Sequence, residues 1–273
     1  MNKYLAEATL PLSAPKLSDS VFESFSMKGK TAIVTGASGG IGHAVSQALA
    51  EAGCNVAMWY NSSKKTEQYA ADIEKQYGVK AKAYQIKITD YDHVVEGIAE
   101  VVKDFGNLTN IVINAGIPSQ EGCLDSKPDD WHKVVNVDFT GAFWCAKAAA
   151  HHFEKQKEGN IIFTASMSGS IVNVPQMQGC YNACKAGIIH LSKSLAVEFA
   201  PWCRVNSVSP GYIDTEISEF ADKSIKAKWH ELTPMGREAD PRELKGAYLY
   251  LASGASTYTT GSDIIVDGGY CCP

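Results

Sequence analysis

The sequence has no apolar stretch long enough to span a membrane, and Met1 to Lys28 lack the apolar core of a secretion signal. It also lacks any long run of one charge, since 25 basic and 30 acidic residues give a net charge of −5. We therefore expect neither a membrane nor a nucleic-acid partner. The eight cysteines include no Cys-x-x-Cys pair and no cluster of four metal ligands, so we expect no metal site and a cytoplasmic protein with reduced thiols.

Length and hydrophobic content fit one α/β domain that follows an N-terminal extension. Of the 273 residues, 45% are hydrophobic, and we place the extension at 1–28 and the domain at 29–273 because no linker or repeat divides the rest. Strands are expected at 31–35, 55–60, 81–86, 110–114, 160–165, 204–209 and 263–267, and helices at 41–52, 64–77, 91–105, 128–153, 181–200 and 241–252. This alternation predicts a Rossmann-like, doubly wound parallel sheet of about seven strands with helices on both faces.

A glycine-rich loop follows the first expected strand and opens the first helix. Its sequence is Thr35-Gly36-Ala37-Ser38-Gly39-Gly40-Ile41-Gly42. In that position small residues let a pyrophosphate approach the backbone, and the N-terminus of the helix faces its negative charge. The alternative is a flexible connection without a ligand, but the strand before it and the helix after it favour nucleotide binding.

The end of the second strand predicts which dinucleotide binds. An acidic residue there would bind the adenine ribose 2′-hydroxyl and repel a 2′-phosphate. Asn61, Ser62 and Ser63 stand there instead, and their side chains can donate hydrogen bonds to phosphate oxygens. Lys64 or Lys65 can add positive charge, although either can equally be part of a solvated helix start. We therefore predict NADP(H) rather than NAD(H) as the cofactor.

Tyr181 and Lys185 lie four residues apart in an apolar stretch that is expected to be helical. Residues at this spacing share one helix face, so the ammonium of Lys185 can lie near the phenol of Tyr181. A nearby cation favours the phenolate and would lower the pKa of Tyr181 from about 10 towards neutrality, where proton exchange with a carbonyl or alcohol is efficient. Alone, the pair is equally compatible with a surface contact; beside a nucleotide-binding loop it indicates hydride transfer.

Further motifs accompany these two in order along the chain. They are Asn114-Ala115-Gly116, Asn136, Ser168 and Pro210-Gly211. Together with the glycine loop and Tyr181-x-x-x-Lys185, this combination resembles the single-domain short-chain dehydrogenases/reductases over about residues 28–270. Segments such as 164–169 and 209–215 are similar to those of the fungal NADP(H)-dependent mannitol 2-dehydrogenases, sorbose reductases and carbonyl reductases.

The resemblance implies a role for each catalytic residue. Ser168 would hydrogen-bond the substrate oxygen, and Tyr181 would deliver a proton to that oxygen as the nicotinamide delivers hydride to carbon. Lys185 would lower the pKa of Tyr181 and hold the nicotinamide ribose hydroxyls. Asn136 would hold a water that links Lys185 to solvent, or would be a helix-interior amide bonded to backbone. Ser166, two residues before Ser168, is the alternative serine.

The resemblance, with the loops already described, implies a cofactor-binding set. Its members are Gly36, Ser38, Gly40, Ile41, Gly42, Asn61, Ser62, Ser63, Asn114, Ala115, Gly116, Tyr181, Lys185, Pro210, Gly211, Ile213 and Thr215. Asn114 is equally compatible with stabilising the sheet. Segment 216–232 would be a mobile substrate lid. Phe220 and Trp229, with Tyr212, would either line an apolar pocket or pack the lid.

These features predict the NADPH-dependent, reversible reduction of a ketone or ketose to a secondary alcohol, with a small molecule as substrate. One alternative is a catalytically inactive NADP(H)-binding regulator of the same fold, which would not need the catalytic residues. Another is a nucleotide-sugar epimerase or dehydratase, which would carry a longer C-terminal domain. A helix around 142–150 and the Tyr181 helix are apolar on most sides, so each is expected to be deeply buried or to pair with a partner, and the resemblance implies a homotetramer.

Overall fold

The computed structural model describes residues 14–119, 121–218 and 221–272, and a parallel sheet of seven strands organises them. The strands are β1 (Thr31–Thr35), β2 (Asn55–Tyr60), β3 (Ala81–Gln85), β4 (Asn110–Ile113), β5 (Asn160–Thr164), β6 (Arg204–Pro210) and β7 (Asp263–Val266). They lie in the order β3-β2-β1-β4-β5-β6-β7. The order reverses between β1 and β4, which is where such sheets bind ligands at their carboxyl edge.

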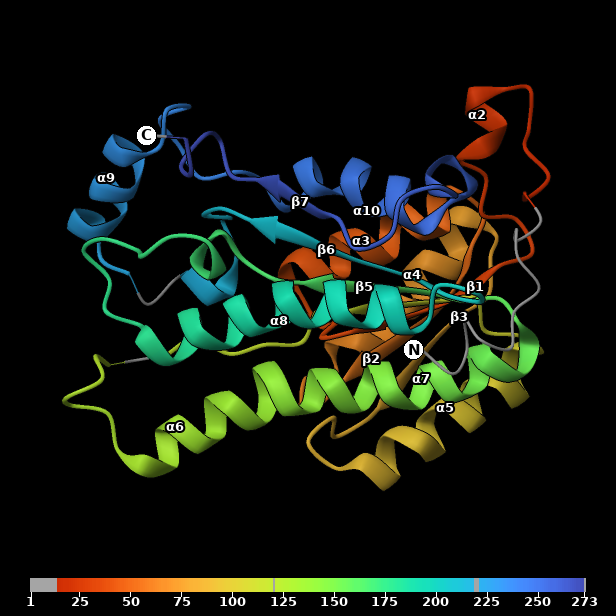
Figure 1. Ribbon diagram of the computed structural model, residues 1–273, viewed down its shortest axis with the longest axis horizontal. Helices are drawn as coiled ribbons and strands as arrows, with labels where there is room; N and C mark the ends of the chain where they lie inside the picture. The colour runs from red at the N-terminus through yellow and green to blue at the C-terminus, as the bar shows by residue number, and fades with distance from the viewer. Residues whose placement is uncertain (1–13, 120, 219–220, 273) are drawn as a thin grey trace.

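Helices cover both faces of the sheet (Figure 1). One face carries α3 (Gly40–Glu51), α4 (Lys65–Tyr77) and α10 (Lys245–Ala252), and the other carries α5 (Tyr91–Phe105), α7 (Ala142–Gln156) and α8 (Gly179–Glu198). Within β1, Ile33 packs into the α5–α7–α8 side, whereas Ala32 and Val34 pack into the α3–α4–α10 side. Burial on both faces explains the unbroken apolar run of this strand, and it confirms the doubly wound sheet.

The long helix expected over 128–153 is instead three elements in sequence. α6 (Pro128–Val135) is followed by η1 (Asn136–Gly141), a turn of π-helix, before α7 begins at Ala142. Gly141 permits this geometry, because a Cβ there would lie 3.0 Å from the carbonyl oxygen of Asn136. The π turn rotates the side chains of this segment relative to a continuous α-helix, and such turns are frequent at functional sites.

Shorter elements complete the described chain. They are α2 (Val21–Ser24), α9 (Lys223–Leu232), and the 3₁₀ turns η2 (Met167–Gly169), η3 (Glu216–Ser218), η4 (Pro241–Leu244) and η5 (Gly254–Ser256). α9 lies in the segment expected as a substrate lid, beyond the carboxyl ends of the central strands (Figure 1). No described helix is both long and apolar enough to cross a membrane.

The packed domain begins before the boundary expected at residue 28. Met27 is only 1% exposed and packs with the α3–α4–α10 side of the core. Its N–H donates to the carbonyl of Ala52 at 2.8 Å, which ties the segment to the end of α3. The C-terminal part of the predicted extension is therefore part of the domain, and residues 1–13 lie outside the described residues.

Candidate active site

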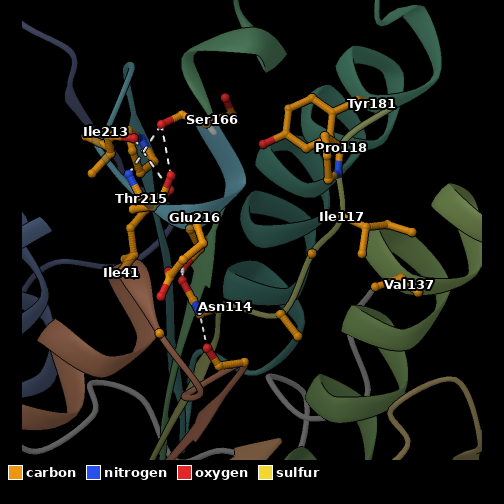
Figure 2. Close-up of a pocket in the computed structure, with 18 of the residues that line it drawn as sticks. Ile41, Asn114, Ile117, Pro118, Val137, Ser166, Tyr181, Ile213, Thr215 and Glu216 are labelled. Carbon is orange, nitrogen blue, oxygen red and sulfur yellow. Dashed lines mark hydrogen bonds between the residues drawn. The ribbon is translucent and has the colours of Figure 1, made fainter. Parts of the chain in front are cut away.

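A cavity of about 740 Å³ opens at the carboxyl edge of the sheet, where the strand order reverses (Figure 2). Sixteen members of the predicted cofactor set line it: Gly36, Ser38, Gly40, Ile41, Asn61, Ser62, Ser63, Asn114, Ala115, Gly116, Tyr181, Lys185, Pro210, Gly211, Ile213 and Thr215. Gly42 is the predicted member that does not. Residues spread over 180 positions of sequence thus meet in one cavity, as the motif order implied.

The glycine turn at the inner wall of the cavity requires its small residues. Gly36 has φ +64°, and a Cβ there would lie 2.8 Å from the Cα of Ala115. A Cβ on Gly42 would collide with the carbonyl of Gly36, so Gly42 acts by close packing rather than by contact with the cavity. The Asn114 amide donates to the carbonyls of Thr35 and Gly36 at 3.2 and 3.3 Å. Asn114 therefore fixes the turn as well as lining the cavity.

The far end of the cavity has the polarity expected for a 2′-phosphate site. It is lined by Asn61, Ser62, Ser63, Lys65 and Lys87. Lys64, the other lysine considered from the sequence, is not among the lining residues and precedes α4 as its cap. Of the described lining residues, the one carboxylate is Glu216, which lies over Gly39 in the glycine turn.

Tyr181 and Lys185 share one face of α8, as their spacing predicted. The Lys185 Nζ lies 5.3 Å from the centroid of the Tyr181 ring and donates to the carbonyl of Thr164 at 3.2 Å. The Tyr181 hydroxyl points into the cavity, on the side where Ser166 lies (Figure 2), and the nearby Ser166 hydroxyl acts to lower the pKa of Tyr181. The side chains come from α8 and the end of β5, two elements that the sheet holds rigidly.

The expected fall in the pKa of Tyr181 is wrong. Burial raises the pKa of Tyr181, the charge of Lys185 opposes that rise, and the charge of Asp138 adds to it. The sequence argument considered the lysine and not the carboxylate beside it. A phenol with a raised pKa carries its proton at neutral pH.

Asp138 is the residue that sequence reasoning missed. Its side chain is 0% exposed, its Oδ2 lies 3.3 Å from Lys185 Nζ, and its Oδ1 accepts from the Ile117 N–H at 2.8 Å. Asn136, predicted for this neighbourhood, is exposed and does not line the cavity, whereas Val137 does (Figure 2). The π turn aims position 138 at Lys185. The signal available in the sequence was an acidic residue between two apolar ones, Val137 and Phe139.

For both members of the buried Asp138–Lys185 pair, burial and the charge of the partner shift the pKa in opposite directions. Burial raises the pKa of Asp138, and Lys185 with the Ile117 N–H opposes this. Burial alone would lower the pKa of Lys185, but Tyr181 and Asp138 outweigh it and the pKa of Lys185 is raised. Gly116 covers the pair: a Cβ there would lie 2.8 Å from Asp138 Oδ2 and 3.3 Å from Lys185 Nζ.

The geometry favours Ser166 over Ser168 as the serine beside Tyr181. After Thr164 the chain turns into η2, so the two serines no longer share a strand face. Ser166 Oγ accepts from the Ser168 N–H at 3.1 Å and its hydroxyl donates to Ser168 Oγ at 3.0 Å. Ser168 Oγ also accepts from Gln178 Nε2 at 3.2 Å. Ser168 lines the cavity too, but its contacts support Ser166 rather than Tyr181.

Carboxamides line the remaining wall near Ser168. Asn173 and Gln178 are 2% and 4% exposed, and Gln176 lines the same region. Gln178 Nε2 donates to Asn173 Oδ1 at 2.8 Å, and Asn173 Nδ2 donates to the Tyr212 hydroxyl at 3.1 Å. Three amide side chains within residues 173–178, immediately before α8, were a signal that sequence reasoning left unused.

The aromatic residues considered from the sequence both pack and line the cavity. The rings of Tyr212 and Trp229 stack with their centroids 4.1 Å apart and an interplanar angle of 10°. Both contribute to the lining. Phe220 lies outside the described residues. Among the residues that the structure describes, no group of three or more His, Cys, Asp or Glu side chains could hold a metal ion.

Comparison with known proteins gives consistent matches over most of the chain. A family model described as enoyl-(acyl carrier protein) reductase matches residues 36–271. A probable NADP-dependent mannitol dehydrogenase of Yarrowia lipolytica is 55% identical over 266 residues, which cover 97% of this chain and 95% of that protein. A sorbose reductase of Candida albicans is 54% identical over 267 residues, with the same coverage of 97% and 95%.

Solved structures with the same fold also match most of the chain. The crystal structure of an NADPH-dependent 3-quinuclidinone reductase from Rhodotorula rubra has a TM-score of 0.93 and 43% sequence identity. The match covers 97% of this chain and 100% of that one.

Proposed function

Because the chain belongs to the short-chain dehydrogenase/reductase family, we propose that it is an NADP(H)-dependent oxidoreductase that reduces a ketose to a polyol and catalyses the reverse reaction. The observation that carries this proposal is the Tyr181 hydroxyl, which points into the cavity that reaches the glycine turn, with Lys185 beside its ring and Ser166 on the same side (Figure 2). The names of the mannitol dehydrogenase and sorbose reductase relatives support a sugar substrate.

The residues at the cavity fit a bound dinucleotide. The glycine turn and the N-terminus of α3 would hold the pyrophosphate, and Lys65 and Lys87 would pair with a 2′-phosphate. Lys185 would contact the ribose next to the nicotinamide. When bound, NADPH supplies the hydride for reduction.

Tyr181 acts as the general acid in this proposal. Its raised pKa keeps the phenol protonated at neutral pH, so that it can donate its proton to the substrate oxygen. The Ser166 hydroxyl donates a hydrogen bond to the same oxygen and stabilises the negative charge that develops there. Lys185 lies beside the phenol and stabilises the phenolate that remains after transfer. Asn136 has no part, because it lies outside the cavity.

The carboxamide wall favours a polyhydroxylated substrate over an aryl ketone. Asn173, Gln176 and Gln178 line the cavity. The amide of Gln178 is used within the protein, on Asn173 and Ser168, whereas the buried Gln176 Oε1 has no hydrogen-bond partner among the described residues and can accept from a sugar hydroxyl. Measuring NADPH oxidation with sorbose, fructose, a small aliphatic ketone and an aryl ketone tests this. We expect the highest kcat/KM with a ketose; a clear preference for the aryl ketone would contradict the assignment.

The cofactor assignment has a matched pair of test variants. Lys65→Glu should lower kcat/KM for NADPH by on the order of tenfold, because a carboxylate would face the 2′-phosphate. Lys64→Glu changes the charge equally but lies outside the lining, so it should have a much smaller effect. Equal effects of both variants, or wild-type preference for NADH, would rule out this 2′-phosphate site.

An inactive NADP(H)-binding regulator is separated from an enzyme by Tyr181→Phe. For an enzyme, we expect turnover to fall at least 10³-fold while NADPH affinity, followed by its fluorescence on binding, changes by only a few fold. If the wild-type chain binds NADPH tightly but reduces none of the four ketones, the regulator replaces the enzyme as the better interpretation.

We also propose a cytoplasmic homotetramer. All eight cysteines are free, which agrees with a reducing compartment. Ala183, Ala186 and Val197 are exposed on one side of α8, where exposed His190 and Lys193 lie between Ala186 and Val197. The two small side chains of Ala183 and Ala186, within one turn, support a close helix-to-helix contact between subunits.

A further inference from the structure

Asp138 places a carboxylate beside the lysine on which the reaction described above depends. Its carboxylate has no exposed surface and lies 3.3 Å from Lys185 Nζ. Lys185 is in turn beside the Tyr181 ring, at 5.3 Å from its centroid. The Ile117 N–H donates to the other carboxylate oxygen and holds the side chain in this orientation. The three ionisable groups thus form a row: carboxylate, ammonium, phenol.

The surroundings of the row contain few other charges. From α8, the thiols of Cys180 and Cys184 face it, and burial raises the pKa of both, so they are neutral. From the end of β5 and the turn after it, the row meets the Thr164 carbonyl and the Ser166 hydroxyl, and from the loop after β4 it meets Gly116 and the Ile117 N–H. In these contacts, Lys185 is the cation that opposes Asp138.

We propose that Asp138 is a positioning residue whose charge offsets that of Lys185 and thereby sets the pH range in which Tyr181 exchanges its proton. The inference rests on the proposed oxidoreductase function. A lone ammonium would favour the phenolate strongly, whereas an ammonium paired with a carboxylate favours it much less. Asp138 therefore keeps Tyr181 protonated to higher pH, which favours ketone reduction at neutral pH.

The sign of the effect follows from the two directions of the reaction. Reduction needs protonated Tyr181, so its rate falls as pH rises through the pKa of Tyr181; oxidation needs the phenolate, so its rate rises there. Removing the negative charge of Asp138 lowers the pKa of Tyr181. In the pH profile of kcat, the falling limb of reduction and the rising limb of oxidation should consequently both move to lower pH. A general loss of packing would not shift the two limbs together.

Asp138→Asn is the closest variant, because its amide oxygen can still accept from the Ile117 N–H. We expect both pH limbs of kcat to shift down by about one pH unit, with oxidation faster than wild type below the wild-type midpoint. Asn136→Ala is the matched control, two residues away and exposed, and should leave both limbs in place. Asp138→Ser, with space for a water, serves if the asparagine variant does not accumulate; it should shift the limbs in the same direction.

A second measurement needs no substrate. The ultraviolet absorbance of tyrosinate is titrated with and without Tyr181→Phe, in the wild-type and Asp138→Asn backgrounds, and each difference isolates Tyr181. A lower midpoint in the Asp138→Asn background supports the proposal even if the substrate has been misidentified. An unchanged midpoint, or unshifted limbs in a folded variant, overturns it and leaves the proposed function standing.

Discussion

At the scale of single residues, the direction of hydrogen bonds decides what each serine can do. The Gln178 amide uses both its hydrogens, one on Asn173 Oδ1 and one on Ser168 Oγ. Ser168 Oγ is therefore fixed as an acceptor, and its own hydrogen can be donated to Ser166 Oγ when a substrate is present. The Ser166 hydroxyl is then able to donate to the substrate oxygen beside Tyr181.

This direction predicts unequal effects of the two serines. Ser166→Ala should lower kcat for ketose reduction by about 10²- to 10³-fold, because a donor to the developing oxyanion is lost. Ser168→Ala should lower it by on the order of tenfold, because only the orientation of Ser166 is disturbed. Steady-state kinetics at saturating NADPH measure both. A larger loss of kcat in Ser168→Ala than in Ser166→Ala would show that Ser168, the serine predicted from the sequence, contacts the substrate.

At the scale of elements, local patterns predicted what depends on neighbours in sequence. All seven strands and the shared face of Tyr181 and Lys185 follow from apolar runs and four-residue spacing. The π turn at 136–141 was not predictable, because no local signal marks a shift from i→i+4 to i→i+5 hydrogen bonds. The π turn is the segment in which Asn136 lies outside the cavity lining while Asp138 lies against Lys185. The choice between Ser166 and Ser168 depended on the turn after β5, which spacing alone does not define.

The packing of α5 on the sheet gives a prediction at this scale. A Cβ at Gly97 would lie 2.7 Å from Ile86 Cδ1 and 3.2 Å from the Trp59 ring, whereas a Cβ at exposed Gly246 in α10 meets nothing within 4 Å. Gly97→Ala should lower the free energy of unfolding by about 1–3 kcal/mol through overpacking. Gly246→Ala should raise it by up to about 1 kcal/mol. Urea denaturation compares them; stabilisation of both would show that α5 can move away from the sheet.

At the scale of the whole molecule, the outer face of α8 connects assembly to the active site. Ala183, Ala186 and Val197 are exposed on the same helix whose inner face presents Tyr181 and Lys185. A subunit contact on this face would hold the helix from outside. Assembly and catalytic geometry are then expected to depend on each other.

Ala186→Glu tests the assembly. A charge in the proposed helix-to-helix contact should reduce the proposed tetramer to smaller species, seen as a lower mass by sedimentation velocity at micromolar concentration. Ala71→Glu, at an exposed alanine of α4 on the opposite layer, introduces the same charge and should leave the mass unchanged. A wild-type chain that sediments as a monomer would refute the tetramer.

The close cover of Gly116 over the Asp138–Lys185 pair also restricts how this chain can change over evolutionary time. Any side chain at position 116 would reach atoms of both charged groups, so mutations there are tolerated only if position 138 shortens or loses its carboxylate first. Laboratory evolution towards a different optimum pH should accordingly find substitutions at 138 before any at 116. Substitutions at positions 138 and 116 would therefore be coupled, with position 138 changing first.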